Sequence, residues 1–271
     1  MHQLQNNGIP TIIATVKIND IPTANVKSFR ALPIKKAHIE TIIASWEDLY
    51  NIPQTPATYI VERGISDAWN AAVFDGGDIE LCFGDTSLAL QDITDCTEKI
   101  VSAGKIPLMI GGEHLVTLGA VRSVANHYPD LHVIHFDAHA DLRDEYLGVG
   151  LSHACVMRRC HELLGDGRIH QFCIRSGDRE EFKFASKHTD MHKFSFEGLK
   201  ELVERLASEN VPVYFTIDLD CLDPSVFPGT GTPEAGGVSF MELLEAIKLV
   251  ARTNVVGADV NELAPMLDNS G

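Results

Sequence analysis

The sequence predicts an α/β fold in which helices cover both faces of a parallel sheet. From about residue 99 onward, short apolar runs alternate with amphipathic segments, and this alternation is typical of parallel strands joined by crossover helices. The chain has 271 residues, of which 45% are hydrophobic, and this suits one large domain with a sizeable core. We therefore expect residues 1–271 to form a single domain.

The predicted strands are short apolar runs, several of which end in glycine or acidic residues. The run KIPLMIGG is the first of the regular region, and its two glycines predict a turn after a buried strand. Continuous apolar runs are expected because parallel strands are buried on both faces. The runs lie at residues 105–112, 131–141, 167–176, 211–220 and 255–260.

Three segments between these runs have helical periodicity. In residues 113–129, Leu115, Leu118 and Val121 fall on one helical face, and Pro129 ends the helix. The other two segments are residues 194–210 and 238–254. Residues 1–70 show a weaker pattern. There TIIATVKI, at residues 11–18, favours a strand because it is β-branched, and four later prolines interrupt any long helix.

The net charge is −16, from 22 Lys and Arg against 38 Asp and Glu. Such acidity argues against nucleic acid or an anionic membrane as partner, and it serves solubility or favours a cationic substrate. No run of eighteen apolar residues predicts a membrane span, and no N-terminal signal pattern is recognisable. The six cysteines form no CxxC pair, which predicts buried free thiols. We expect a soluble, cytoplasmic protein.

Metal-competent side chains follow the ends of two predicted strands. In HFDAHADLRD, Asp137, His139 and Asp141 occupy alternate positions, and alternate side chains of an extended segment point to one side. Asp218 and Asp220 repeat this spacing in IDLDCLDP. We expect these five side chains to converge just past the strands, because ligands bind beyond the carboxyl ends of parallel strands.

Two further strand ends contribute to the same rim, with His114 after MIGG and Glu262 after ADVN. Four aspartates and two histidines gathered without a cation would cost several kcal/mol in repulsion and desolvation. Carboxylates with some imidazole suit Mn²⁺. Six ligands suit two ions about 3.5–4 Å apart, which activate a water between them. The cluster therefore predicts metal-assisted hydrolysis.

Each motif alone also fits an ordinary structure. A DxHxD pattern fits a solvated loop in a chain with 12 His and 38 acidic residues, and Asp218 with Asp220 fits a helix-capping turn before Pro224. Their combination with GGEH on neighbouring strand ends favours the metal site. The histidines without such a context are expected on the surface or in the core. These are His127, His161, His170, His188 and His192.

Several motifs resemble those of the ureohydrolase (arginase/agmatinase) family, and most of all bacterial agmatinases. They are GGEHLVTLG, FDAHADLRD, LSHA and, most specifically, TIDLDCLDPSVFPGTGTPEAGG. The resemblance runs from about Phe74 to the end of the chain. It implies an arginase-like three-layer α/β/α sandwich with a mainly parallel sheet and two Mn²⁺ ions.

The resemblance also implies a role for each site residue. One Mn²⁺ would bind His114, Asp137, Asp141 and Asp218, and the other would bind Asp137, His139, Asp218 and Asp220, with Asp137 and Asp218 as bridges. His153 in LSHA matches the family's proton-shuttling histidine. Glu262 in NELAP matches the glutamate that pairs with the substrate guanidinium.

These roles agree with the chemistry of guanidines. The guanidinium carbon is a poor electrophile, so a metal-held hydroxide is a suitable nucleophile. A carboxylate pairs well with the planar cation, and a histidine can protonate the leaving amine. Without the LSHA motif around it, His153 would be interpreted as an incidental loop histidine. The glycines of PGTGTPEAGG fit either a tight loop beside the site or a plain connection.

The expected reaction is Mn²⁺-dependent hydrolysis of agmatine to putrescine and urea by a metal-bridging hydroxide, a step of polyamine biosynthesis. Agmatine's tail is an amine without a carboxylate, which an acidic entrance suits. Arginase or guanidinobutyrase activity on a related guanidine stays open, as does a non-catalytic metal-binding homologue. The resemblance implies a homo-oligomer, either a trimer or a hexamer.

Two features depart from the family's pattern. The family begins with a strand and a loop, containing glycine and arginine, that shapes the substrate entrance, and residues 1–70 show no recognisable version of it. The family also continues past DNSG with a closing helix, whereas this chain stops at Gly271. We expect these ends to leave metal binding intact but to give weak activity and poor stability.

Overall fold

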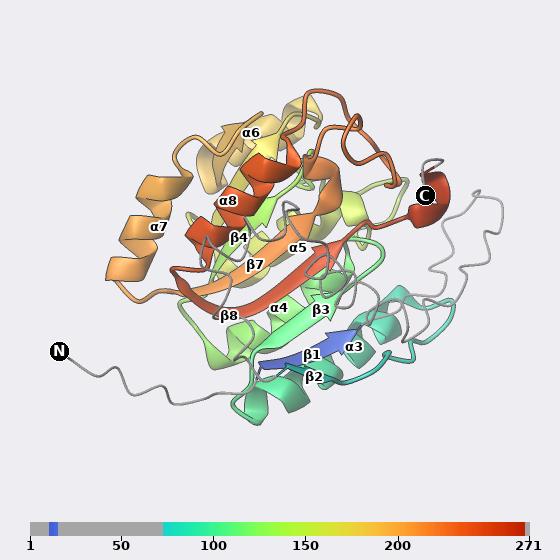
Figure 1. The fold of residues 1–271 in the computed structure, drawn as a ribbon. Helices are drawn as coiled ribbons and strands as arrows, with labels where there is room; N and C mark the ends of the chain where they lie inside the picture. The colour runs from blue at the N-terminus through green and yellow to red at the C-terminus, as the bar shows by residue number, and fades with distance from the viewer. Residues whose placement is uncertain (1–10, 16–72, 269–271) are drawn as a thin grey trace, which may run out of the picture.

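The computed structural model describes residues 11–15 and 73–268, and Figure 1 shows them as a sheet between two helical layers. Eight strands form one sheet in the order β2-β1-β3-β8-β7-β4-β5-β6, and every neighbouring pair is parallel. The strands are β1 Thr11–Thr15, β2 Val73–Asp75, β3 Pro107–Ile110, β4 His132–Phe136, β5 Ile169–Ile174, β6 Asp190–Lys193, β7 Pro212–Asp218 and β8 Asn254–Asn261. The helices are α3 Thr86–Ser102, α4 Val116–His127, α5 Val156–Leu164, α6 Arg179–His188, α7 Leu199–Ser208 and α8 Phe240–Val250.

The two faces of the sheet bury separate cores. Along β4 and β7 successive side chains alternate between them, as strand geometry requires. Val133 and Tyr214 pack into the core beneath α3, α4 and α5, whereas Ile134 and Phe215 pack into the core beneath α7 and α8. The predicted three-layer sandwich is confirmed.

The predicted strands and helices are found close to their expected positions. Each predicted apolar run overlaps one strand, namely β3, β4, β5, β7 or β8, and TIIATVKI contains β1. The three segments with helical periodicity contain α4, α7 and α8. The expectations for the rest of residues 1–70 lie outside the described residues.

Several elements were not predicted, namely α3, α5, α6, β2 and β6. The α6 sequence REEFKFASKH is largely polar, and it is fixed at its start by a reciprocal capping box between Asp178 and Glu181. The β6 sequence DMHK has no apolar pattern, and it forms because β5 offers an edge to pair with. Capping in α6 and pairing in β6, rather than hydrophobic periodicity, define these two elements.

Two composition-based expectations can be compared with the described part of the chain. Cys155, Cys160, Cys173 and Cys221 are buried free thiols as predicted, but Cys82 is exposed. Among the described helices, none has the length and hydropathy needed to cross a membrane.

Replacing Gly257 with Ala should destabilise the sheet between β7 and β8. Gly257 pairs with Tyr214 across β8 and β7, and an added Cβ would lie 2.8 Å from Cδ2 of that fully buried ring. Such overpacking costs about 1–3 kcal/mol. Urea unfolding should therefore show a lower midpoint for Gly257→Ala. The control Gly150→Ala, whose Cβ would meet nothing closer than 3.5 Å, should unfold near the wild-type midpoint, and equal midpoints for both variants would refute the packing argument.

Candidate metal centre

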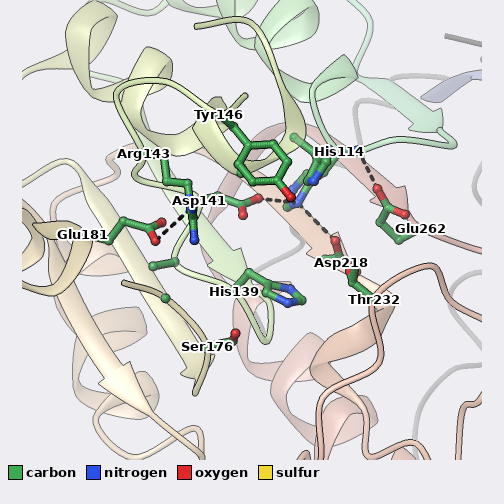
Figure 2. A pocket seen from close by; sticks show the side chains of 14 residues that line it. His114, His139, Asp141, Arg143, Tyr146, Ser176, Glu181, Asp218, Thr232 and Glu262 are labelled. Carbon is green, nitrogen blue, oxygen red and sulfur yellow. Dashed lines mark hydrogen bonds and ion pairs between the residues drawn. The ribbon is translucent and has the colours of Figure 1, made fainter. Parts of the chain in front are cut away.

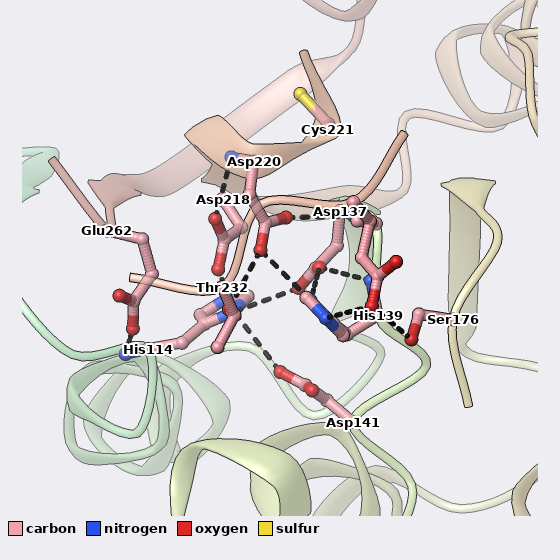
Figure 3. A network of polar contacts seen from close by, with 12 residues as sticks. His114, Asp137, His139, Asp141, Ser176, Asp218, Asp220, Cys221, Thr232 and Glu262 are labelled. Carbon is pink, nitrogen blue, oxygen red and sulfur yellow. Dashed lines mark hydrogen bonds and ion pairs between the residues drawn. The ribbon is translucent and has the colours of Figure 1, made fainter. Parts of the chain in front are cut away.

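Four neighbouring strands deliver the predicted site residues to one rim of the sheet. In the order β3-β8-β7-β4, His114 follows β3, Glu262 follows β8, Asp218 ends β7 and Asp137 follows β4. Figure 3 shows these side chains pointing toward one another from their separate strands. The predicted convergence at the carboxyl ends of the strands is confirmed.

The ring of His114 faces three carboxylates. Its Nδ1 atom lies 3.0 Å from Asp137 Oδ2, 3.3 Å from Asp141 Oδ2 and 3.2 Å from Asp218 Oδ2. The residue is only 1% exposed, and its Nδ1 has no hydrogen bond of good geometry. Buried polar atoms normally have a partner. A nitrogen ringed by three acid oxygens in this way fits a divalent cation as its missing partner.

Asp137, His139 and Asp220 form a second group beside the first. The Nδ1 atom of His139 lies 2.9 Å from Asp220 Oδ2 and 3.4 Å from Asp137 Oδ1. Asp137 thus presents Oδ2 to His114 and Oδ1 to His139. One carboxylate between two imidazoles is the arrangement expected of a bridging ligand.

The backbone that aims these side chains differs from the prediction. Strand β4 ends at Phe136, and Asp141 has a φ of 55°, so residues 137–141 are not an extended segment with alternating side chains. Asp220 lies in the short 3-10 helix Leu219–Cys221 that follows β7. The side chains do converge, but through turns rather than through strand alternation.

Backbone N–H groups hold the carboxylates in place. Asp218 Oδ1 accepts a hydrogen bond of 2.9 Å from the N–H of Asp220, which is the capping interaction considered as the alternative reading of this pair. Asp220 Oδ1 accepts one of 3.0 Å from the N–H of Ala138. Asp218 therefore caps a turn and also joins the cluster.

Burial and mutual repulsion disturb the protonation of the cluster. Burial, followed by the charges of Asp220 and Asp137, raises the pKa of Asp218 well above its usual range. Burial and the charge of Asp137 also raise the pKa of Asp220. A cation among these carboxylates would reverse both effects, because it stabilises their charged forms.

A buried hydrogen-bond network orients the imidazole of His114. Its Nε2 atom lies 3.0 Å from Thr216 Oγ1, which is 3.4 Å from Thr117 Oγ1. The amide of Asn261 donates to Thr117 Oγ1 at 3.0 Å and to Asp259 Oδ1 at 2.8 Å. Partners of this kind fix the orientation of a metal-binding imidazole, so the network supports His114 from behind.

His135 also contacts the cluster and was not predicted. Its Nε2 atom lies 2.8 Å from Asp137 Oδ2, and its Nδ1 lies 3.1 Å from the amide nitrogen of Gln171. That amide also donates to the carbonyl of Ala140 at 2.7 Å. The signal was present in the sequence, because His135 stands two residues before Asp137 and so shares its side of the chain.

Replacing His135 with Ala should weaken metal binding without removing a proposed ligand. Loss of a partner that orients a ligand typically lowers metal affinity about 10–100-fold. Calorimetric titration with Mn²⁺ measures this change. The control His170→Ala removes a similarly buried imidazole from β5 that pairs with Asp190 instead, and it should keep the wild-type affinity. Unchanged affinity in His135→Ala would show that Asp137 needs no such support.

A pocket of about 150 Å³ opens onto the cluster. Figure 2 shows that its lining comes from the strand ends on one side and from the segment around Tyr146 on the other. Its lining includes His114, His139, Asp141, Arg143, Tyr146, His153, Glu181, Asp218, Thr232 and Glu262. A pocket of this volume suits a small molecule with one end against the clustered acids.

Glu262 is held rigidly at the edge of this pocket. Its φ is 63°, its N–H donates to the carbonyl of Gly112 at 2.7 Å, and its Oε1 accepts from the N–H of His114 at 3.0 Å. Burial and the neighbouring charge of Glu113 raise its pKa to about 7. A cation bound against this carboxylate would favour its charged form.

His153 lines the pocket from a short 3-10 helix, His153–Cys155. Its Nδ1 atom lies 3.4 Å from Glu113 Oε1, and its ring meets Tyr146 edge to face at 5.6 Å between centroids. The hydrogen bond with Glu113 raises the pKa of His153. Its side chain is 36% exposed, so it can exchange protons with solvent while facing the pocket.

Arg143, Tyr146 and Glu181 line the pocket and were not predicted as site residues. Arg143 Nε lies 3.4 Å from Glu181 Oε2, and its guanidinium carbon lies 5.1 Å from the centre of the Tyr146 ring. Glu181 Oε1 accepts from the N–H of Leu142 at 3.0 Å. Of these three residues, only Arg143 belongs to one of the motifs, FDAHADLRD. Tyr146 and Glu181 lie outside the motifs, and the fold brings them to Arg143.

The glycine-containing loop after β7 does pass beside the site. Arg175 fixes it, because its Nη2 donates at 2.7 Å to the carbonyls of both Asp220 and Glu234. At Gly237 an added Cβ would lie 2.4 Å from the backbone nitrogen of Asp223. Of the two readings, the tight loop is correct.

Comparison with known proteins identifies the class to which this fold and site belong. Residues 47–271 match the Arginase family. The match covers most of the chain, so the chain belongs to the arginase family, the ureohydrolases.

Within that family the chain is most like the bacterial agmatinases, as its motifs predicted. It is 48% identical over 200 residues to the agmatinase of Bacillus anthracis, a match that covers 73% of this chain and 69% of that protein. The structure of a putative agmatinase from Clostridium difficile aligns with a TM-score of 0.79 and 40% identity, over 97% of this chain and 91% of that one. The arginase of Bacillus caldovelox, at 22% identity and a TM-score of 0.71 over 96% of this chain and 93% of that one, shares the fold.

Proposed function

We propose that this chain is an agmatinase, which hydrolyses agmatine to putrescine and urea with two Mn²⁺ ions. The observation that carries the proposal is the buried pair of imidazole–carboxylate groups that share Asp137 at the floor of a small pocket. The agmatinases among its relatives support the choice of substrate.

The proposed ligand sets extend the two groups, because the resemblance to the family makes Asp218 a ligand of both ions. His114, Asp137, Asp141 and Asp218 would hold one ion, and Asp137, His139, Asp218 and Asp220 would hold the other. Their carboxylate-rich composition favours Mn²⁺, because no cysteine sulfur contributes. When bound, such a pair of ions supplies a water that is acidic enough to act as a nucleophile near neutral pH.

Glu262 would position the substrate for attack. Its carboxylate is held by the N–H of His114, directly beside the first ligand group. A planar guanidinium can donate two parallel hydrogen bonds to one carboxylate. This pairing places the guanidinium carbon near the clustered acids and keeps its charge compensated inside a buried pocket.

His153 would give a proton to the leaving amine. Cleavage of the bond between the guanidinium carbon and the alkyl nitrogen yields urea and putrescine, and that nitrogen must gain a proton to leave. The contact with Glu113 favours the protonated form of His153. After transfer, its partly exposed ring can regain a proton from water.

The far end of the pocket bears on the choice of guanidine. Arg143 adds a positive charge there, but the carboxylates of Glu181 and Asp178 lie 3.4 and 3.8 Å from its Nε. The three groups together carry a net negative charge, which suits the amine of agmatine better than the carboxylate of arginine or 4-guanidinobutyrate.

The proposal also covers organisation and assembly. We propose one ureohydrolase domain, because the described strands form a single sheet. We further propose a homo-oligomer, a trimer or hexamer, since Phe194, Phe240 and Met241 are large apolar residues exposed on the surface. Light scattering of the Mn²⁺-loaded protein measures the assembly, and a monomer would overturn that part.

The test of the substrate is urea release from agmatine, arginine and 4-guanidinobutyrate, measured side by side with Mn²⁺. We expect agmatine to have the highest kcat/KM. Faster turnover of arginine or 4-guanidinobutyrate would reassign the chain to the corresponding ureohydrolase. Stoichiometric metal without hydrolysis of any guanidine would indicate a non-catalytic metal-binding homologue.

A further inference from the structure

A second cluster of metal-competent side chains lies outside the pocket, formed by His161, Asp166 and His188. Both imidazoles aim one nitrogen at the same carboxylate oxygen. His161 Nε2 lies 2.8 Å from Asp166 Oδ1, and His188 Nδ1 lies 2.7 Å from that atom. The two imidazole nitrogens therefore converge on one carboxylate oxygen, and the three ligand atoms lie within 4.8 Å of one another although they come from two helices and the loop between α5 and β5.

The backbone fixes Asp166 between the two histidines. Gly165 and Gly167 flank it, with left-handed φ values of 88° and 72°. The N–H of Gly165 donates to the carbonyl of His161 at 2.7 Å, and the N–H of Gly167 donates to the carbonyl of His188 at 3.0 Å. Each flanking residue is thus tied to one of the histidines that face the carboxylate.

The two imidazole rings are also held in orientation. The ring of Phe184 stacks on His188 at 4.3 Å between centroids and meets His161 edge to face at 4.9 Å. The guanidinium of Arg158 lies 3.9 Å from the centre of the same phenyl ring. Ligands whose rings are already fixed by neighbours lose less conformational freedom when an ion binds.

The cluster is remote from the proposed catalytic ions. Helices α5 and α6 both begin near the pocket, where His153 and Gly177 line it, and both run away from it toward the cluster. His188 is the last residue of α6, roughly 14 Å from the start of that helix, and His161 is the sixth residue of α5, roughly 8 Å from its start. Asp166 is 68% exposed, so an ion can reach the cluster directly from solvent.

We propose that His161, Asp166 and His188 form a separate surface site for a zinc-type divalent cation. Two imidazoles and one carboxylate are the ligand set of open four-coordinate zinc sites, in which water takes the remaining position. Each imidazole would then keep its proton on its other ring nitrogen. The three ligand atoms would have to move apart to about 3.3 Å to surround an ion with bonds of 2.0–2.1 Å. The side chain of Asp166 is 68% exposed, which gives it room to shift away from the two imidazoles.

A second His–Asp–His arrangement provides a matched control. Asp190 contacts His170 through Oδ2 at 3.0 Å and His192 through Oδ1 at 3.1 Å, so these imidazoles lie against different oxygens. His192 is 28% exposed, against 32% for His188. The two histidines differ in the convergence of their ligand atoms, which is the property that the proposal invokes.

The test is equilibrium dialysis of Mn²⁺-loaded protein against Zn²⁺, followed by metal analysis. The pocket is the same in every variant, so differences between variants report the surface cluster alone. Wild type and His192→Ala should retain one more zinc per chain than His161→Ala, Asp166→Asn or His188→Ala. Zinc should also raise the melting temperature more in wild type than in His188→Ala, because the ion joins the ends of α5 and α6.

Equal zinc content in wild type and all three cluster variants would overturn the proposal. Loss of zinc in His192→Ala as well would also overturn it, because it would show a general effect of removing histidines. The agmatine assay is separate from both outcomes, so this site and the proposed catalytic function can fail independently.

Discussion

The Asp137→Asn variant should lose both metal ions, and agmatine hydrolysis should disappear with them. Asp137 is fully buried, and its two oxygens face the separate imidazoles of His114 and His139. An amide lacks the charge that offsets two cations and offers only one good acceptor atom. We expect the same loss for Asp218→Asn, the other proposed bridge. Metal analysis after dialysis measures the stoichiometry.

Asp190→Asn is the matched control for these variants. Asp190 begins β6, where its two oxygens contact the imidazoles of His170 and His192, and it lies outside both ligand groups. Its amide should leave both ions in place. Retention of two ions in Asp137→Asn would contradict the bridging role and require another ligand between the two groups.

The His153→Ala variant should keep both ions but hydrolyse agmatine about 10²-fold more slowly or worse, which is the typical loss of a general acid. The effect should fall on kcat, because the proposed step follows substrate binding. Added imidazole should restore part of the rate if the missing group is a proton donor.

The control for this variant is His127→Ala. His127 is 33% exposed and pairs with Glu98, much as His153 is 36% exposed and pairs with Glu113, but it lies at the end of α4, away from the pocket. Its removal should leave kcat unchanged. If His153→Ala lost metal as completely as Asp137→Asn, His153 would have to be regarded as part of the metal centre instead.

Most of the sheet could be predicted because its strands are buried on both faces. Runs such as VIHF and VYFTI have no other simple explanation, and the helices between them show a clear apolar stripe. Two of the elements that escaped prediction depend on partners. Strand β6 needs the edge of β5, and α6 needs the reciprocal cap between Asp178 and Glu181.

The proposed metal ligands could be predicted because they are local to strand ends. The directions of their side chains could not be predicted, because the left-handed turn at Asp141 and the 3-10 helix containing Asp220 leave no simple pattern in the sequence. The lining contributed by Tyr146 and Glu181, and the surface cluster around Asp166, depend on segments that only the fold brings together. Among the residues that contact the cluster but were not predicted, only His135 could have been found by counting alternate positions.

The proposed centre also explains why so many acids are buried together. Burial raises the pKa of Asp218 and of Asp220, so without a cation these groups resist ionisation. Bound cations stabilise the folded state over the unfolded chain by mass action. The carboxylate cluster therefore destabilises the folded state of the metal-free protein and binds cations strongly.

The most direct test is a titration of metal-free protein with Mn²⁺, in which bound metal and urea release from agmatine are followed together. The account predicts that urea release depends on added Mn²⁺ and reaches its maximum when two ions are bound per chain. Uptake of two ions without urea release would contradict the proposed catalytic role, and full activity with fewer than two ions would contradict the binuclear centre.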